Sequence, residues 1–304
     1  MLDARSTLLF ALALLAVVFA GMWFVQLRRQ RQRSAEKHAP GPIELTIGFI
    51  SDFLDTLGIS SFATTTAMFR ATKVVGDRQL PGTLNVGHAL PTVLQAFIYI
   101  VLVEVDFLTL AALIAASVVG AGLGATWVAR LSERAVRLGM GVALLLAAVL
   151  IFARLRGFLP GGSDALELRG VLLAVGVLGN FVLGALMTLG IGLYAPCMIL
   201  VSLLGMNPTA AFPIMMGSCA FLMPVASRSF VRQGAYQPRA ALGLTLGGLP
   251  AVWIAANIVK NLELETMRWL VLVVVLYTGT ALLLAARRPR HEATAQAETT
   301  TSQV

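Results

Sequence analysis

Two carboxylates and a cluster of hydroxyl side chains lie in the middle of a long apolar segment. Asp52 and Asp55 precede Gly58, and five hydroxyl side chains follow it: Ser60, Ser61, Thr64, Thr65 and Thr66. An acidic side chain at membrane depth is costly unless it faces a partner or a water-filled cavity, and it usually marks function. Glycine with clustered serine and threonine is typical of a break in a membrane helix. The stretch therefore predicts a functional helix break.

A break of this kind offers a site for an anion. The N-terminus of a half-helix presents unpaired backbone N–H groups and the positive end of the helix dipole. Two such ends meeting near the membrane midplane would hold a small oxyanion without a fixed arginine. In the first half of the chain, the candidate contacts are the backbone at Gly58 and the hydroxyls of Ser60, Ser61, Thr64 and Thr65. The alternative is that these hydroxyls only cap helix ends.

A second apolar segment supplies the matching candidates. Residues 170–205 are too long for one straight crossing and are interrupted by Gly190, Gly192 and Pro196. The predicted anion contacts here are backbone groups from Gly190 to Cys197, including Gly192, and the hydroxyl of Tyr194. For the two cysteines, Cys197 and Cys219, the alternative is a role in packing alone.

A polar stripe follows the first break. Asn85, His88, Thr92 and Gln95 are spaced so that they share one helix face. Asn85 is a candidate contact of the anion. His88 is a candidate proton carrier together with Asp52 or Asp55, because histidine titrates near neutral pH. The alternative for His88 is a buried histidine whose hydrogen bonds are satisfied.

Composition defines the broad class. Of 304 residues, 58% are hydrophobic and 12% are charged, whereas soluble domains carry about 25% charged residues. The apolar residues form runs of about 20, the length of a membrane-spanning helix. The net charge of +8 comes from basic residues in short loops, where they set topology rather than bind nucleic acid. The three histidines lie far apart and no Cys/His spacing fits a metal, so neither a metal nor a cofactor is expected.

The sequence predicts an all-α polytopic membrane protein with one N-terminal helix and two repeats. Each repeat is a broken, re-entrant helical hairpin followed by three transmembrane helices. The predicted units are an N-terminal transmembrane helix (1–27), a basic cytoplasmic linker (28–42), repeat 1 (43–154), an inter-repeat loop (155–169), repeat 2 (170–286) and a disordered cytoplasmic tail (287–304).

Matching motifs indicate the repeat. The sequence Thr-Leu-Gly-Ile at 56–59 recurs at 188–191, an offset of 132 residues, and Pro81 matches Pro213 at the same offset. Three spanning helices after each hairpin make the second repeat inverted relative to the first. Inverted repeats with broken helices at the midplane are typical of secondary transporters.

The basic residues favour hairpins that return to the side they entered. The basic segments 28–37, 70–78, 130–137, 228–239 and 287–290 then all face the cytoplasm, as the positive-inside rule requires. The loops at 104–106 and 205–208, which lack lysine and arginine, fall outside. The exceptions to the rule are five basic residues in two other outer loops: Arg154, Arg156 and Arg169 in one, and Lys260 and Arg268 in the other. The N-terminus is predicted outside and the C-terminus in the cytoplasm.

Three segments resemble the repeated signatures of the TauE/SafE sulfite-exporter family: Gly-Ile-Ser-Ser-Phe-Ala-Thr-Thr-Thr-Ala at 58–67, Pro-Gly-Thr-Leu-Asn-Val-Gly-His-Ala-Leu-Pro at 81–91, and Leu-Gly-Ile-Gly-Leu-Tyr-Ala-Pro-Cys at 189–197. The resemblance covers about residues 43–286. It implies a permease of the bacterial inner membrane that moves a small anion such as sulfite, a sulfonate or an organic acid.

Other classes remain as alternatives. An anion channel or a membrane scaffold subunit would share the apolar helices. An intramembrane serine hydrolase would use Ser60 or Ser61 with His88, but the sequence has no Gly-x-Ser-x-Gly elbow. The prediction is a transporter and not an enzyme. Its expected partners are a small anionic substrate and the lipid bilayer, with no nucleic acid, and a homodimer is left open.

Overall fold

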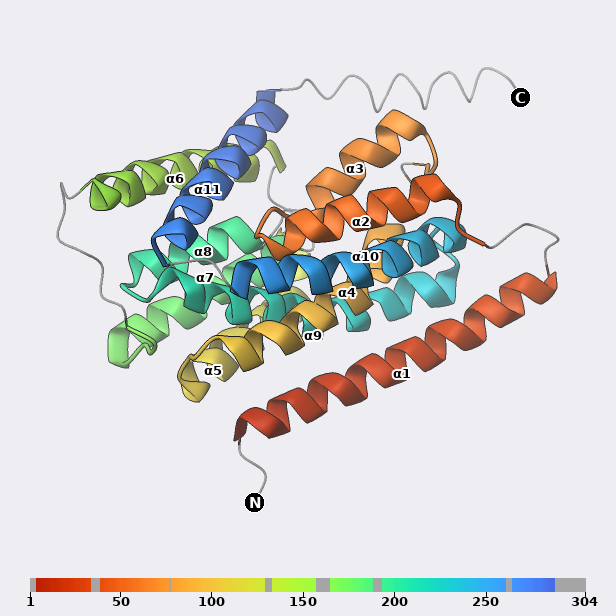
Figure 1. Ribbon diagram of the computed structural model, residues 1–304, viewed down its shortest axis with the longest axis horizontal. Coiled ribbons are helices and arrows are strands. Elements are labelled where there is room, and N and C mark those ends of the chain that lie inside the picture. The colour runs from red at the N-terminus through yellow and green to blue at the C-terminus, as the bar shows by residue number, and fades with distance from the viewer. Residues whose placement is uncertain are drawn as a thin grey trace.

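The computed structural model describes residues 4–33, 39–76, 78–128, 133–156, 165–187, 193–260 and 264–287. These ranges are almost entirely helical (Figure 1). The helices are α1 (Ala4–Arg33), α2 (Pro42–Thr56), α3 (Ser61–Thr72), α4 (Leu80–Leu102), α5 (Phe107–Val128), α6 (Glu133–Leu155), α7 (Gly170–Met187), α8 (Tyr194–Leu203), the short 3-10 helix η1 (Pro208–Ala210), α9 (Ala211–Gln233), α10 (Pro238–Lys260) and α11 (Leu264–Arg287).

Several of these helices suit a bilayer. Five described helices are long and apolar enough to cross a membrane: Ala4–Gln30, Leu80–Leu102, Gly170–Met187, Pro208–Gln233 and Pro238–Ile258. Shorter apolar helices occupy Phe107–Leu123, Tyr194–Leu203 and Trp269–Leu284. The predicted class, an all-α polytopic membrane protein, is confirmed.

The N-terminal helix is longer than expected. The sequence predicted a linker from residue 28, but α1 continues through the basic run to Arg33. Arg28 lies over the ring of Phe24, with its guanidinium carbon 4.4 Å from the ring centroid. This contact covers the apolar part of the arginine side chain while its charged group stays accessible to water, so the basic residue is compatible with a continuing helix.

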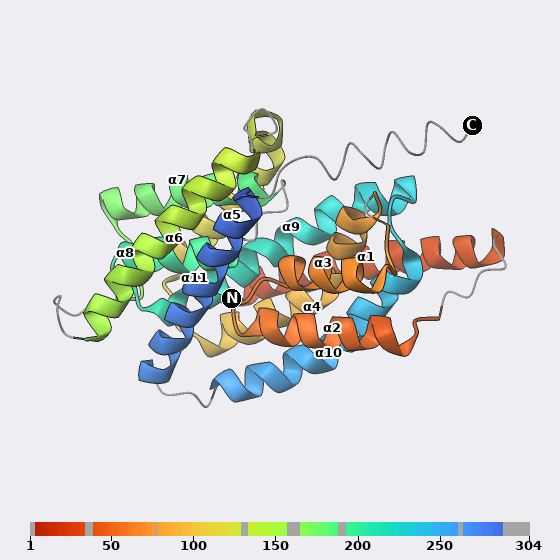
Figure 2. The ribbon, with the colours of Figure 1, turned by 90° about the horizontal axis from the view of Figure 1, so that it is seen from above.

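The first broken segment folds into a hairpin. Ile47, near the start of α2, shares one buried cluster with Phe69, near the end of α3. The two helices are therefore antiparallel, and α3 leads back to the end of the molecule where α2 begins (Figures 1 and 2). In the second half, Leu200 of α8 lies against Gly179 of α7, and Leu204, just after α8, against Gly176. The end of α8 thus lies beside the first half of α7.

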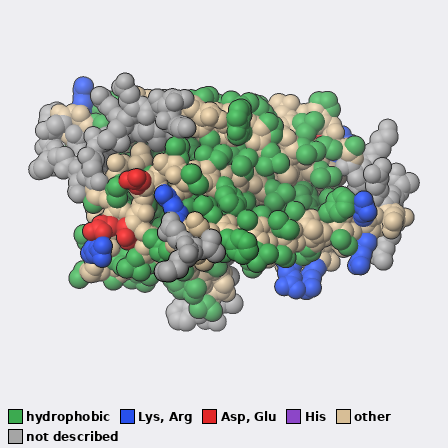
Figure 3. All heavy atoms as spheres, turned by 60° about the horizontal axis from the view of Figure 1, so that its bottom comes forward, with side chains coloured by type: hydrophobic (Ala, Val, Ile, Leu, Met, Phe, Trp, Pro, Cys, Tyr) green, Lys and Arg blue, Asp and Glu red, His purple; other side chains and the backbone are tan. Residues whose placement is uncertain are grey.

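Charged side chains gather at the two ends of the molecule (Figure 3). At one end, Trp23 donates to the hydroxyl of Tyr236 at 3.2 Å, and that hydroxyl donates to Gln30. The basic residues on the segments near this end are Arg28, Arg29, Arg70, Lys73, Arg78, Arg228, Arg232 and Arg239. At the other end, Asp106 and Asn207 both hydrogen bond to residues 165–166 through the backbone. The loops at 104–106 and 205–208 therefore lie together, away from the basic end.

Glycines bring two pairs of helices into backbone contact. A methyl group at Gly247 of α10 would overlap the carbonyl oxygen of Leu45 in α2. In the other pair, a methyl group at Gly184 of α7 would overlap the carbonyl oxygen of Ser117 in α5. Small residues allow this approach, and close packing takes the place of hydrophobic driving force between membrane helices. The pairs α2–α10 and α5–α7 thus form tight units on either side of α4 and α9.

Candidate functional site

A glycine ends α2 and creates the first break. Gly58 has φ +98, a conformation that favours glycine. Its N–H donates to the carbonyl of Asp55 at 2.8 Å, and the N–H of Ile59 donates to the carbonyl of Leu54 at 3.0 Å. This pair of bonds is the Schellman motif, which ends a helix by satisfying its last carbonyl groups. The break predicted around Gly58 is therefore present.

The carboxylate of Asp55 closes the N-terminus of α3. The backbone N–H of Ser61, the first residue of α3, donates to Oδ1 of Asp55 at 2.5 Å. A carboxylate is favoured at a helix N-terminus by the dipole and by the unpaired N–H groups. The position at which the sequence predicted an anionic ligand is thus occupied by a carboxyl group of the chain itself, and the 2% exposure of Asp55 shows that it is buried.

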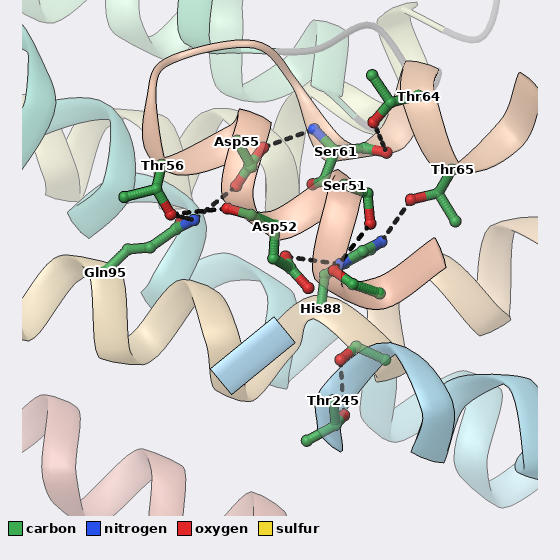
Figure 4. Close-up of polar contacts among 12 residues, drawn as sticks. Ser51, Asp52, Asp55, Thr56, Ser61, Thr64, Thr65, His88, Gln95 and Thr245 are labelled. Carbon is green, nitrogen blue, oxygen red and sulfur yellow. Dashed lines mark hydrogen bonds and ion pairs between the residues drawn. The ribbon is translucent and has the colours of Figure 1, made fainter. Parts of the chain in front are cut away.

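A glutamine joins this carboxylate to the second half of the chain. Gln95 of α4 donates from Nε2 to Oδ2 of Asp55 at 3.1 Å and to the hydroxyl of Thr56 at 3.0 Å (Figure 4). Its Oε1 accepts from the hydroxyl of Tyr194, the first residue of α8, at 3.1 Å. Both polar atoms of the amide are therefore used, and one side chain links α2, α4 and α8.

A second polar line runs through His88. Its Nδ1 lies 2.9 Å from Oδ1 of Asp52, and its Nε2 lies 3.0 Å from the hydroxyl of Thr65. All three side chains are fully buried, and Figure 4 shows them pointing toward one another from α2, α4 and α3. A threonine hydroxyl both donates and accepts, so it can serve either protonation state of Nε2. The hydroxyl on His88 belongs to Thr65 and not to Ser60 or Ser61, the predicted nucleophiles of the hydrolase alternative.

One oxygen of Asp52 has no hydrogen-bond partner among the described groups. This atom, Oδ2, lies against Gly248 of α10, where an added methyl group would overlap it and would also meet the ring of Pro91. Neither neighbour offers a donor at the position it presents. A buried polar atom without a partner is costly. The pocket therefore does not fully stabilise an ionised Asp52, because one of its two oxygens receives no hydrogen bond.

Hydroxyl groups of threonine and tyrosine satisfy two backbone carbonyl groups near the break. Pro91 has no N–H, so the carbonyl of Gly87 in α4 lacks its helical partner and accepts from the hydroxyl of Thr245 at 2.6 Å. The hydroxyl of Tyr99 donates to the carbonyl of Thr56 at the end of α2, at 3.0 Å. The first bond ties α10 to α4, and the second ties α4 to the break at the end of α2.

Some predicted site residues lie apart from this network. The hydroxyl of Thr64 bonds to the carbonyls of Ser60 and Ser61 in its own helix. Asn85 bonds to the carbonyl of Pro81, one turn earlier in α4. The cap residue Ser60 makes no side-chain capping bond. The side chains of Thr64 and Asn85 thus bond within their own segments, and a role for Ser60, Thr64 and Asn85 as anion contacts stays a prediction. Gly190 and Gly192 lie outside the described residues.

Sulfur side chains replace carboxylates in the second half. The thiol of Cys219 donates to the thioether of Met187 at 3.6 Å, and Cys197 is fully buried in α8. The methyl group of Met198 lies so close to Gly58 that a Cβ there would be 2.6 Å from it. The second half thus packs against the first break with apolar, polarisable groups. Among the described residues, no three His, Cys, Asp or Glu side chains gather as metal ligands.

The sequence placed Gln95 on the polar stripe without assigning it a role, and it did not single out Tyr99, although a signal was available. Gln95 lies about two helical turns after His88 and Tyr99 one turn further, so both continue the helix face that carries His88. For Thr245 there was no such signal, because its role depends on the packing of α10 against α4.

The geometry defines a polytopic membrane protein with a buried polar centre at a helix break. The family model described as sulfite exporter TauE/SafE matches residues 1–151 and 172–303. The chain therefore belongs to this transporter family. The match includes the first helix, the linker and most of the tail, so it extends beyond the 43–286 range expected from the motifs. Searches of curated proteins and of solved structures found no match.

Proposed function

We propose that this protein is a proton-coupled secondary transporter of sulfite or a related small anion. The observation that carries the proposal is the Asp55 carboxylate on the N-terminus of α3, 2.5 Å from the N–H of Ser61. An internal carboxylate at this position has the charge and hydrogen-bonding geometry of a small oxyanion. The substrate and Asp55 would therefore compete for the same backbone group.

Competition of this kind couples the anion to a proton. An ionised Asp55 holds the N–H of Ser61 with a charge-assisted hydrogen bond, which is about twice as strong as a neutral one. When Asp55 takes up a proton, that bond weakens and the repulsion of a nearby anion disappears. Anion and proton then bind together and leave together. The candidate contacts are Ser61 at the N-terminus of α3, Gly58 in the turn before it, and Tyr194 and Cys197 in the first turn of α8.

The line through Asp52, His88 and Thr65 supports the proton part of the proposal. Asp52 and His88 form a hydrogen-bonded pair that can hold one proton more or less, and Thr65 adapts to either state of His88. Asp52 lies one helical turn before Asp55 on α2. The pair is thus placed to exchange protons with the carboxylate that competes with the anion.

The helix neighbours support two inverted repeats. If repeat 1 contributes α2–α6 and repeat 2 contributes α7–α11 in the same order, the neighbours α2–α10 correspond to α7–α5. The neighbours α4–α9 and α6–α11 correspond to themselves. A pseudo-two-fold relation of this kind is the architecture that allows alternating access around a central site.

The charge distribution supports the proposed orientation. We place the basic end, with the α1 C-terminus and the α9–α10 loop, in the bacterial cytoplasm, so that the N-terminus lies outside. An ion pair at this end joins the first hairpin to α10, with Nε of Arg239 2.7 Å from Oε1 of Glu44. We propose that the protein lies in the bacterial inner membrane, with a homodimer as its assembly.

Transport in proteoliposomes tests the function. We expect saturable uptake of sulfite, or of a small sulfonate or carboxylate from a test panel, that accelerates when the outside is more acidic than the inside. Unitary conductance would indicate an anion channel instead. The absence of both, with the protein correctly inserted, would indicate a scaffold subunit and would contradict the proposal.

A further inference from the structure

Gln95 is the feature that connects the proton-binding half to the other half. Its Nε2 atom donates to Asp55 and Thr56 on α2, and its Oε1 atom accepts from Tyr194 on α8. Gln95 is fully buried, and the four side chains come from three helices. When Asp55 is ionised, the direction of each bond is fixed, because an ionised carboxylate only accepts and an amide nitrogen only donates.

Protonation of Asp55 reverses this direction. The backbone N–H of Ser61 cannot turn away from Oδ1, so the proton is accommodated on Oδ2, which faces the amide of Gln95. An O–H group there needs an acceptor, and the amide supplies one by turning its Oε1 atom toward Asp55. Thr56 loses one hydrogen bond in this turn and keeps the bond from its hydroxyl to the carbonyl of Asp52.

The turned amide changes the role of Tyr194. Its Nε2 atom now faces the hydroxyl of Tyr194, which becomes an acceptor toward Gln95. The hydroxyl proton of Tyr194 is then free to donate to another group. We propose that Gln95 is a positioning residue that turns the Tyr194 hydroxyl into a donor for the anion only when Asp55 carries a proton. The inference rests on the proposed function. In it, Tyr194 contacts the anion only when Asp55 is protonated.

The other titratable groups around Asp55 do not connect it to the second half of the chain through an amide, as Gln95 does. They are Asp52 on its own helix, His88 on α4, Tyr194 on α8 and Cys219 on α9. Tyr194 interacts with Asp55 directly, and of these groups it is also the one joined to Asp55 through a side chain that can exchange its donor and acceptor ends. Asp52 and His88 are joined to each other and to Thr65 instead.

A double-mutant cycle tests the inference. Sulfite uptake into proteoliposomes is measured at fixed internal pH and varied external pH for wild type, Gln95→Leu, Tyr194→Phe and the double variant. We expect each single variant to lose about fivefold to tenfold of the acid-stimulated uptake, the effect of about one hydrogen bond. The double variant should lose no more than either single one. Tyr277→Phe, which changes a half-exposed tyrosine of α11, is the control and should match wild type.

Two outcomes separate the claims. If wild type shows no sulfite uptake that depends on the pH gradient, the proposed function and this inference both fall. If wild type does respond while the two losses are additive, or while both variants match wild type, only the inference is wrong.

Infrared spectroscopy gives a measurement that does not depend on transport by the variants. With isotope-labelled tyrosine, the C–O stretch of a hydroxyl shifts when that hydroxyl changes from donor to acceptor. We expect acidification of wild-type protein to shift one tyrosine band that is missing from Tyr194→Phe. An unchanged tyrosine spectrum across the pH range of the uptake response would overturn the inference.

Discussion

The centres of the two halves occupy matching places but have opposite chemistry. At the repeat offset of 132 residues, Asp55 corresponds to Met187 and Thr65 to Cys197. In the first half, carboxylates, an imidazole and hydroxyls are buried and hydrogen bonded across three helices. In the second half, the thiol of Cys219 meets the thioether of Met187.

This difference indicates a division of labour. Buried charges need hydrogen-bond donors and carry a desolvation cost, so they usually mark places that bind a ligand or transfer a proton. Buried sulfur groups pack without such a cost. We infer that the first half binds protons and competes with the anion, while the second half closes the site with apolar contacts and contributes the Tyr194 hydroxyl.

The largest expected effect is at Gly58, where the two halves touch. Gly58→Leu should abolish sulfite uptake with the protein still inserted, because φ +98 is strained for leucine and Met198 occupies the space of a Cβ. Gly170→Leu is the control for strain, since Gly170 has φ +54 and open space around it. Uptake by Gly58→Leu comparable to that of the control would show that contact between the halves at the break is unimportant.

The next effect compares a glycine beside the Asp52 carboxyl group with a glycine on an open helix face. Gly248→Ala should push the carboxyl group of Asp52 away from its place beside α10 and weaken its contact with His88. We expect a loss of stability of about 1–3 kcal/mol, the usual cost of overpacking, and reduced acid-stimulated uptake. Gly122→Ala in α5 meets nothing within 4 Å and should leave thermal unfolding unchanged. Equal behaviour of the two variants would contradict the described position of Asp52.

A smaller effect is expected at the hydroxyl on His88. Thr65→Val keeps the shape of the side chain and removes the partner of Nε2, so the response of uptake to the pH gradient should fall about fivefold, the value of one hydrogen bond. Thr72→Val is the matched control, because Thr72 lies at the exposed end of the same helix and bonds only within it. If both variants keep the wild-type response, the line through His88 is structural.

The smallest effect is expected in the sulfur centre. Cys219→Ala removes the contact with Met187 and should lower the free energy of unfolding by about 1 kcal/mol, as for a small buried deletion. The shape of the pH profile of sulfite uptake should not change. Thermal unfolding in detergent and uptake in proteoliposomes measure the two quantities. A changed pH profile would show that the second half also takes part in proton binding.

Much of the fold and part of the site follow from the sequence. The break was predictable because Gly58 follows two carboxylates in an apolar segment, and the proximity of His88 to these carboxylates was expected from the polar stripe. The return of Asp55 to the N–H of Ser61 was not, because it depends on the path of the two residues after the glycine. The bond from Tyr194 to Gln95 spans 99 residues, so only the folded structure reveals it, in which α4 and α8 both pack on α9.

The central claim is that Asp55 and the anion compete for the N-terminus of α3. The direct test is the affinity of purified protein for sulfite as a function of pH, in wild type and in Asp55→Asn. In wild type, affinity should fall as pH rises and Asp55 ionises. In Asp55→Asn, which stays neutral, affinity should keep its acid value apart from the titration of sulfite itself, which is common to both proteins. The same pH dependence in both proteins would contradict the account.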